Sequence, residues 1–300
     1  MDLVSLGEIL IDIIQVDDEI KYNPGGAPLN LSSTISKYGL KSSFIGKVGN
    51  DSYGKMIVDY LRNYDLDTSG ISFDSSNTTL AYVKVVNNER YFKFDRSADI
   101  NLSISDIDNN IDLIKGCKIF HFGSLSLTDD PSKSATLYAI KKAREFNKVI
   151  TFDVNYRESL WKEKDTKIIN DVLEYVDILK VSDDEAYLLT NEKDLDKQLD
   201  ILSNKVKLVI ITLGSNGSIY KMNDKSGKVG SIKVNVVDPT GAGDIYFGTF
   251  LYEYLINDML LDDESIIKYM EKASIASGIS VTRYGAISSI PSIEEVESYE

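Results

Sequence analysis

The feature that most constrains the fold is an alternation of short, strand-like apolar runs with longer segments of helical periodicity. The strand-like runs include "CKIFHFG" (117–123), "VITFDV" (149–154), "DILKVS" (177–182) and "KLVIITLG" (207–214). Helical patterns are expected at 28–38, 51–63, 131–147, 241–257 and 262–281, with an opening strand or bent strand pair at 2–14 and a hairpin at 217–236. Such alternation predicts an α/β fold whose mainly parallel sheet is covered by helices on both faces.

A β-hairpin interrupts this alternation early in the chain. The runs "LAYVKVV" (80–86) and "RYFKFD" (90–95) alternate apolar and polar residues around a short turn, which is the pattern of a half-buried hairpin. No linker rich in Pro, Gly or Ser divides the sequence. We therefore expect one α/β domain over 1–300, with a small β lid formed around 12–22 and 80–96.

Composition excludes several classes of partner. The 33 basic residues and 47 acidic residues give a formal net charge of −14, which disfavours binding to nucleic acid and to anionic membranes. The single cysteine, Cys117, cannot form an intramolecular disulfide and fits a reducing compartment. The opening segment lacks the basic region of a signal peptide, and no apolar run reaches about 18 residues. A cytoplasmic location is the expectation.

The stretch "DPTGAGD" (238–244) lies between an expected strand and an expected helix. The first turn of a helix leaves backbone N–H groups that can bind an anion. The small residues Gly241, Ala242 and Gly243 leave that approach open, and Asp244 beside it can accept a proton from an attacking hydroxyl. An acid at a helix start also interacts favourably with the helix dipole, but capping explains neither glycine.

A second cluster, "NPGGAPLN" (23–30), precedes the helix expected at 28–38. Gly25 and Gly26 let the backbone approach a ligand closely, and Pro28 suits the first helical turn. Asn30 offers both a donor and an acceptor, which suits a polyhydroxyl ligand. The same pattern is also that of an ordinary turn followed by a helix.

Together these clusters resemble the two signatures of the ribokinase-like (PfkB-type) carbohydrate kinases, in the same order along the chain. The resemblance covers almost the whole sequence, because 44–71, "TLGSNG" (212–217) and "VTRYGAISSIP" (281–291) are also similar to family segments. It implies a ribokinase-like three-layer sandwich with a small β lid. It also implies an enzyme that uses ATP and Mg²⁺ to phosphorylate the primary hydroxyl of a sugar.

The resemblance implies a role for each matching residue. Asp244 would be the general base, and Gly241, Ala242 and Gly243 would form the anion hole. The sugar would contact Asp12, Gly25, Gly26 and Asn30, and the nucleotide would contact Asn155, Ser182, Thr212, Gly214 and Gly217. Glu185 would organise Mg²⁺ through water, and Asp238 matches a position linked to K⁺ in some members.

The choice of sugar depends on three further segments. "FHFGSLSLTDDPSKSA" (120–135) resembles fructokinases, whereas "DVNYRESLW" (153–161) resembles both fructokinases and 2-keto-3-deoxygluconate kinases. In those relatives the equivalent of Arg157 reaches the transferred phosphate. An expected arginine is replaced by Phe94, so either Arg96 serves in its place or this sugar contact is lost. Tyr82 matches a substrate-facing aromatic on the lid, although lid tyrosines also pack between subunits.

Fructose is the substrate expected first, with 2-keto-3-deoxygluconate or another sugar as the alternative. A dinucleotide-binding oxidoreductase is disfavoured because no G-x-G-x-x-G follows the first strand, and a P-loop NTPase lacks its G-x-x-x-x-G-K-[ST] motif. A non-catalytic sugar- or nucleotide-binding regulator on the same fold stays open. The lid of relatives often pairs two subunits, which implies a homodimer through the lid.

Overall fold

The computed structural model describes residues 1–16, 19–86 and 89–299. A large sheet forms the centre of this part of the chain, in the strand order β13-β12-β11-β10-β9-β8-β1-β4-β5. Its strands are β1 (Leu3–Leu6), β4 (Ser42–Gly49), β5 (Ile71–Asp74), β8 (Ile119–Gly123), β9 (Val149–Asp153), β10 (Ile178–Ser182), β11 (Leu208–Thr212), β12 (Ser218–Met222) and β13 (Lys225–Val229). All neighbouring pairs are parallel except those of the terminal hairpin, β11–β12 and β12–β13.

Helices cover both faces of this sheet, as the near-continuous apolar strands predict. One face packs on α3 (Ile104–Asn109), α4 (Ile111–Gly116), α5 (Ser132–Glu145), α7 (Lys167–Asp171), α8 (Asp183–Thr190) and α9 (Leu195–Ser203). The other face packs on α1 (Ala27–Lys37), α10 (Ala242–Ile256) and α11 (Asp263–Ser280), and α2 (Ser52–Arg62) and α12 (Ile293–Glu297) extend this layer. The expected three-layer sandwich is confirmed.

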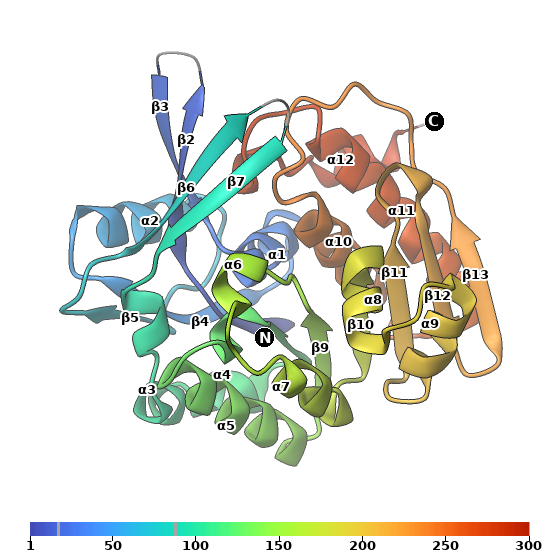
Figure 1. Cartoon of the computed structure of the whole chain (residues 1–300), viewed down its shortest axis with the longest axis horizontal. Coiled ribbons are helices and arrows are strands. Elements are labelled where there is room, and N and C mark those ends of the chain that lie inside the picture. Colours follow the sequence, from blue (N-terminus) through green and yellow to red (C-terminus); the bar gives the residue numbers. More distant parts are fainter. Residues whose placement is uncertain (17–18, 87–88, 300) are drawn as a thin grey trace.

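A smaller sheet stands outside the sandwich, and we call it the lid. It contains β2 (Leu10–Val16), β3 (Glu19–Gly25), β6 (Thr79–Val86) and β7 (Glu89–Asp95) in the order β3-β2-β6-β7. Strands β2 and β6 are parallel, and the other two pairs are antiparallel hairpins. In Figure 1 these strands cross the upper left of the molecule, away from β11–β13 at the right. The turn considered for the segment 23–30 is in fact preceded by a lid strand, because β3 includes 23–24 and ends at Gly25.

Several elements differ from the sequence-based expectation. The hairpin expected over 217–236 ends at Val229, and residues 230–238 contain neither helix nor strand. The helices α3, α4, α9 and α12 and the strand β5 are too short for their periodicity to have been recognised. Among the described residues, no helix has the length and apolar character needed to cross a membrane.

The strand order fixes where a ligand can bind. After β1 the chain first places β4 and β5 on one side of β1, and it then returns to place β8 to β11 on the other side. The direction in which strands are added therefore reverses at β1. In open α/β sheets the crevice at such a reversal, beyond the carboxyl ends of the strands, is the usual ligand site. Here the start of the lid strand β2 lies directly after β1, so lid and crevice are adjacent.

Candidate active site

A cavity of about 530 Å³ lies at the carboxyl ends of the strands, beneath the lid. It brings together thirteen of the predicted site residues: Asp12, Gly26, Asn30, Asn155, Arg157, Ser182, Glu185, Thr212, Gly214, Gly241, Ala242, Gly243 and Asp244. Glu8, Leu10, Phe94, Leu125 and Lys180 also line it. The lid therefore contributes the apolar side chains Leu10 and Phe94 as well as the acid Asp12 to this wall.

The glycine loop before α10 forms the expected helix start. Gly241 is the N-cap and has φ +77°, a left-handed conformation that favours glycine. A Cβ at this position would lie 2.7 Å from the Cβ of Ala286, so the space also excludes a side chain. The first-turn N–H groups of a long helix and its dipole make this end suitable for a phosphate.

Asp244 lies in the first turn of α10 and is buried, with 7% of its surface exposed. Its Oδ2 accepts a hydrogen bond from Asn30 Nδ2 at 2.7 Å, and its Oδ1 accepts one from Asn155 Nδ2 at 3.1 Å. Burial raises the pKa of Asp244 to about 6, although the hydrogen bond from Asn30 and the positive charge of Lys180 oppose this. The carboxylate is thus oriented by two amides and is a stronger base than an exposed aspartate.

Lys180 was not among the sequence predictions, although it lies within an apolar strand. Its Nζ lies 3.0 and 3.1 Å from the two carboxylate oxygens of Asp153, and both side chains are buried. A Cβ added to Gly243 would lie 2.8 Å from this Nζ, which places the ammonium group against the glycine loop. Burial acts to lower the pKa of Lys180, but Asp153, Glu185 and Asp244 outweigh it and the pKa is raised.

The Lys180–Asp153 contact is therefore best described as an ion pair. Burial raises the pKa of Asp153, and the charge of Lys180 opposes that effect. We take the ammonium charge as fixed, because carboxyl groups approach it from three positions. The pair places a permanent positive charge beside the loop predicted to bind an anion.

Glu8, two residues after the end of β1, is a second residue that the sequence did not single out. It is buried, with 3% of its surface exposed, and burial raises its pKa to about 7. Its Oε1 accepts a hydrogen bond from the backbone N–H of Ala27, the first residue of α1. The position of this acid just beyond the end of an apolar strand could have indicated its place in the site, because ligand-binding residues gather at strand ends.

The predicted glycine pair passes closely over two acids. Gly26 has φ +125°, and a Cβ there would lie 2.2 Å from the backbone oxygen of Glu8. A Cβ at Gly25 would lie 2.5 Å from Oδ2 of Asp12. Side chains at these positions would displace the acids that border the cavity. The close approach seen here is to these acids, whereas the sequence predicted close approach to a ligand. Gly26 lines the cavity, and Gly25 is not among its lining residues.

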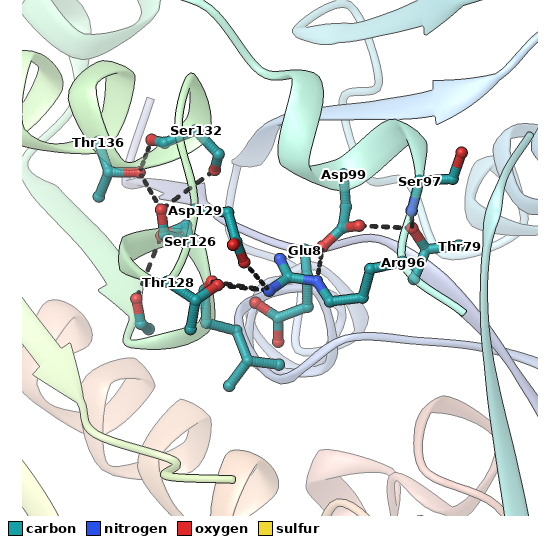
Figure 2. A network of polar contacts seen from close by, with 12 residues as sticks. Glu8, Thr79, Arg96, Ser97, Asp99, Ser126, Thr128, Asp129, Ser132 and Thr136 are labelled. Carbon is teal, nitrogen blue, oxygen red and sulfur yellow. Dashed lines mark hydrogen bonds and ion pairs between the residues drawn. The ribbon is translucent and has the colours of Figure 1, made fainter. Parts of the chain in front are cut away.

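Arg96 does not line the cavity. Its guanidinium donates to Asp99 and Thr128, and Nη1 donates to the Leu125 carbonyl at 3.3 Å. Figure 2 shows this network, which ties the end of the lid to residues 125–129. Phe94 lines the cavity at the position where an arginine was expected. The prediction that Arg96 replaces that arginine as a direct sugar contact is not supported by this arrangement.

Tyr82 also lies outside the cavity. Asp12, Ala81 and Phe94 are paired across the lid, and Asp12 and Phe94 face the cavity. Neighbouring residues of a strand point to opposite faces, so Tyr82 projects from the other face, where it is 40% exposed. The geometry does not support its prediction as a sugar contact.

A second cavity of about 560 Å³ adjoins the first. The two share the residues Thr212, Gly214, Pro239, Ala242 and Gly243. Of the residues that the resemblance assigned to the nucleotide, Gly217 lines only the second cavity, whereas Asn155 and Ser182 line only the first. Much of the remaining wall comes from 231–234 and Val236 and from three small residues of α11. These are Ser274, Ser277 and Gly278, whose spacing puts them on one helix face.

Ser182 and Glu185 form a capping box at the start of α8. Glu185 Oε2 accepts from the Ser182 N–H at 2.8 Å, and Oε1 accepts from the Tyr156 N–H at 2.7 Å. Within the described ranges no group of three His, Cys, Asp or Glu side chains is arranged to hold a metal ion. A carboxylate oxygen has a second lone pair, so Glu185 still fits contact with a metal-bound water.

Asp238 lies apart from both cavities and is 2% exposed. Its Oδ1 accepts from the Thr240 N–H at 2.8 Å, and its Oδ2 accepts from the Gly285 N–H at 3.0 Å. It also borders a smaller cavity of about 210 Å³ with Asn23, Tyr284 and Ser288. The residue thus connects the glycine loop to the loop before α12.

The fold and the paired cavities define a ribokinase-like kinase site, with a glycine loop that lines both cavities and a buried carboxylate beside it in the first. The pfkB family carbohydrate kinase model matches residues 1–293, so the chain belongs to the pfkB family of carbohydrate kinases. The family consists of phosphotransferases that use ATP to phosphorylate a sugar hydroxyl. This excludes the oxidoreductase and P-loop interpretations.

Individual relatives are similar over nearly their whole length. The chain is 35% identical to probable fructokinase-2 of Arabidopsis thaliana, covering 99% of this chain and 95% of the relative. It is 34% identical to fructokinase-2 of Solanum lycopersicum, covering 98% and 94%. A fructokinase from Vibrio cholerae O395, solved with fructose, ADP and a calcium ion, superposes with a TM-score of 0.91 at 27% identity, covering 100% and 99%.

Proposed function

We propose that this protein is a fructokinase that transfers the γ-phosphoryl group of ATP to the primary hydroxyl of fructose, giving fructose 6-phosphate and ADP. The observation that carries the proposal is the place of Asp244, which lines the first cavity at the start of α10, next to Ala242 and Gly243, which line both cavities. The similar fructokinases support the choice of sugar.

In this mechanism Asp244 accepts the hydroxyl proton while the sugar oxygen attacks the γ-phosphorus and the bond to the β-phosphate oxygen breaks. Asn30 and Asn155 hold the carboxylate in place. The backbone of Gly241, Ala242 and Gly243 stabilises the phosphoryl group in transit. Such transfer depends mainly on positioning and on charge stabilisation. Lys180 supplies a fixed charge at this loop, and we assign Arg157, which also lines the cavity, to the same phosphoryl group.

Mg²⁺ would bind chiefly to ATP phosphates and water, which is its usual mode with nucleotides. Glu185 would orient the metal-bound water, while its two backbone contacts fix the carboxylate. The ion would neutralise phosphate charge. The nucleotide itself would occupy the second cavity, with Thr212, Gly214 and Gly217 along it and Ser182 at its phosphate end. We place K⁺ beside Asp238, where it would act through the glycine loop.

We further propose a homodimer through the lid. The outer face of the lid carries Ile20, Tyr22 and Tyr82, which are 57%, 44% and 40% exposed. The rings of Tyr22 and Tyr53 stack at a centroid distance of 5.7 Å, which holds part of this face against α2. Large apolar side chains gathered on one face favour burial against a second copy.

We expect the enzyme to prefer fructose over 2-keto-3-deoxygluconate by about 100-fold or more in kcat/KM, because the sugar end favours a neutral substrate. Arg96 is engaged with Asp99 and Thr128, and Phe94 lines the wall. The described lining cations, Arg157 and Lys180, both act electrostatically on Asp244, at the phosphoryl end. ATP-dependent turnover of both sugars by the purified protein measures the ratio. Preference for the keto acid would contradict the proposed substrate.

Activity should also depend on the protonation of Asp244. Its raised pKa of about 6 predicts that kcat/KM falls about tenfold per pH unit below pH 6, because the protonated carboxyl cannot accept the hydroxyl proton. Burial and Glu8 raise this pKa, whereas Asn30, Lys180 and Arg157 lower it. A pH profile of fructose phosphorylation from pH 5 to 8 checks this. An acid limb centred near pH 4 would indicate an ordinary exposed carboxylate instead.

A further inference from the structure

Glu8 occupies the point where the strand order reverses, between β1 and the lid. Its side chain lines the first cavity although the residue is only 3% exposed. It lies on the sugar side, against the start of α1, and the backbone of Gly26 passes over it. A buried carboxyl group at a cavity wall requires a full account of its hydrogen bonds.

That account leaves one oxygen without a partner. Oε1 accepts from the Ala27 N–H at 2.8 Å, whereas Oε2 is buried and has no hydrogen-bond partner among the described residues. The Arg96 guanidinium interacts with Glu8 electrostatically. Figure 2 draws the two side chains close together, with the hydrogen bonds of Arg96 directed to Asp99 and Thr128 instead. The positive charge of Arg96 thus favours the ionised form of Glu8, although Arg96 donates no hydrogen bond to Oε2.

Asn30 provides a second observation of the same kind. Its Nδ2 donates to Asp244, but its Oδ1 is buried and lacks a partner among the described residues. Two residues that line one cavity thus each carry a buried acceptor without a partner, and such a pair suits a ligand with two hydrogen-bond donors. The apolar residues Leu10, Phe94 and Leu125 line the same cavity and suit the C–H face of a sugar ring.

We propose that Glu8 is a specificity-determining residue, whose Oε2 accepts a hydrogen bond from a hydroxyl of the bound sugar. The site then selects a neutral sugar with a hydroxyl at that position. This inference rests on the proposed function, because it names how the same site recognises its substrate. Asp244, not Glu8, remains the group that takes the proton.

The test is the Glu8→Gln variant, because glutamine keeps an oxygen for the Ala27 N–H and turns the second acceptor into a donor. We expect KM and Kd for fructose to rise roughly 10- to 100-fold, as for a lost hydrogen bond to a charged group, with little change in kcat or in KM for ATP. Calorimetry with a non-hydrolysable ATP analogue gives the Kd. Glu264→Gln is the matched control, since the Glu264 side chain is 82% exposed.

A set of monodeoxy fructose analogues separates recognition from a structural role. Wild type should discriminate strongly against the analogue that lacks the contacted hydroxyl, and Glu8→Gln should lose that discrimination. The inference would be overturned if the variant has an unchanged Kd for fructose, or if the variant binds fructose and every analogue more weakly by the same factor. Either result leaves the proposed function supported as long as the wild type phosphorylates fructose. If wild type binds fructose without turning it over, only the proposed function fails. If it does not bind fructose, both fail.

Discussion

The Asp244→Asn variant is expected to lose about 10³-fold in kcat for fructose phosphorylation. Asparagine fills nearly the same volume and can still accept from Asn30 or Asn155, but it cannot take the proton of the attacking hydroxyl. General base catalysis by a positioned side chain typically contributes about 10² to 10⁴ in rate. Steady-state kinetics measures the loss, and calorimetry checks that ATP still binds.

Asp224→Asn, at an exposed turn residue, is the control for an aspartate-to-asparagine change away from the cavity. Its kcat should match that of wild type. If Asp244→Asn retains more than a tenth of wild-type kcat, Asp244 is not the general base. If wild type binds ATP but phosphorylates none of the tested sugars, the chain is better described as a non-catalytic regulator on this fold.

The Lys180→Met variant should lose about 10² to 10³ in kcat, the range found when one stabilising donor is removed from a charged transition state. The ammonium group lies against the glycine loop, so its charge is available to the phosphoryl group in transit. Methionine has a similar length but no charge. Initial rates at saturating fructose and ATP measure the effect.

A structural contribution must be separated from this loss, because the variant leaves Asp153 buried without its partner. Removing one member of a buried ion pair costs about 3–5 kcal/mol of folding free energy. Adding Asp153→Asn to Lys180→Met should restore most of the thermal stability without restoring kcat. Recovery of both would mean that Lys180 acts only by holding the fold together.

Most of the architecture could be predicted from the sequence because long, regular segments show a clear pattern of apolar residues. The parallel strands other than β5 were recognisable from apolar runs, and α1, α5, α10 and α11 from their periodicity. The two glycine clusters placed Asp244 and Asn30 in one cavity before any contact was known. Short elements such as α3 and α4 are fixed by packing on the sheet rather than by local pattern, so they were missed.

Other site residues depend on geometry that a single sequence does not contain. Whether Tyr82 or its neighbours face the cavity is decided by the pairing register of the lid. Arg96 is turned away by Asp99 and Thr128, which pair with it only after folding. Lys180 lies within an apolar strand, where its role became recognisable only once the strand end and the glycine loop were seen together.

The two amides that orient Asp244 come from distant parts of the chain. Asn30 is separated from it by 214 positions and Asn155 by 89. Such non-local contacts form late relative to local helices, because the intervening chain must first be closed into large loops. The hydrogen bonds that orient this carboxylate are therefore complete only when α1 and the loop after β9 have both docked on α10. A chain that has regained its helices but not this docking would be compact and inert.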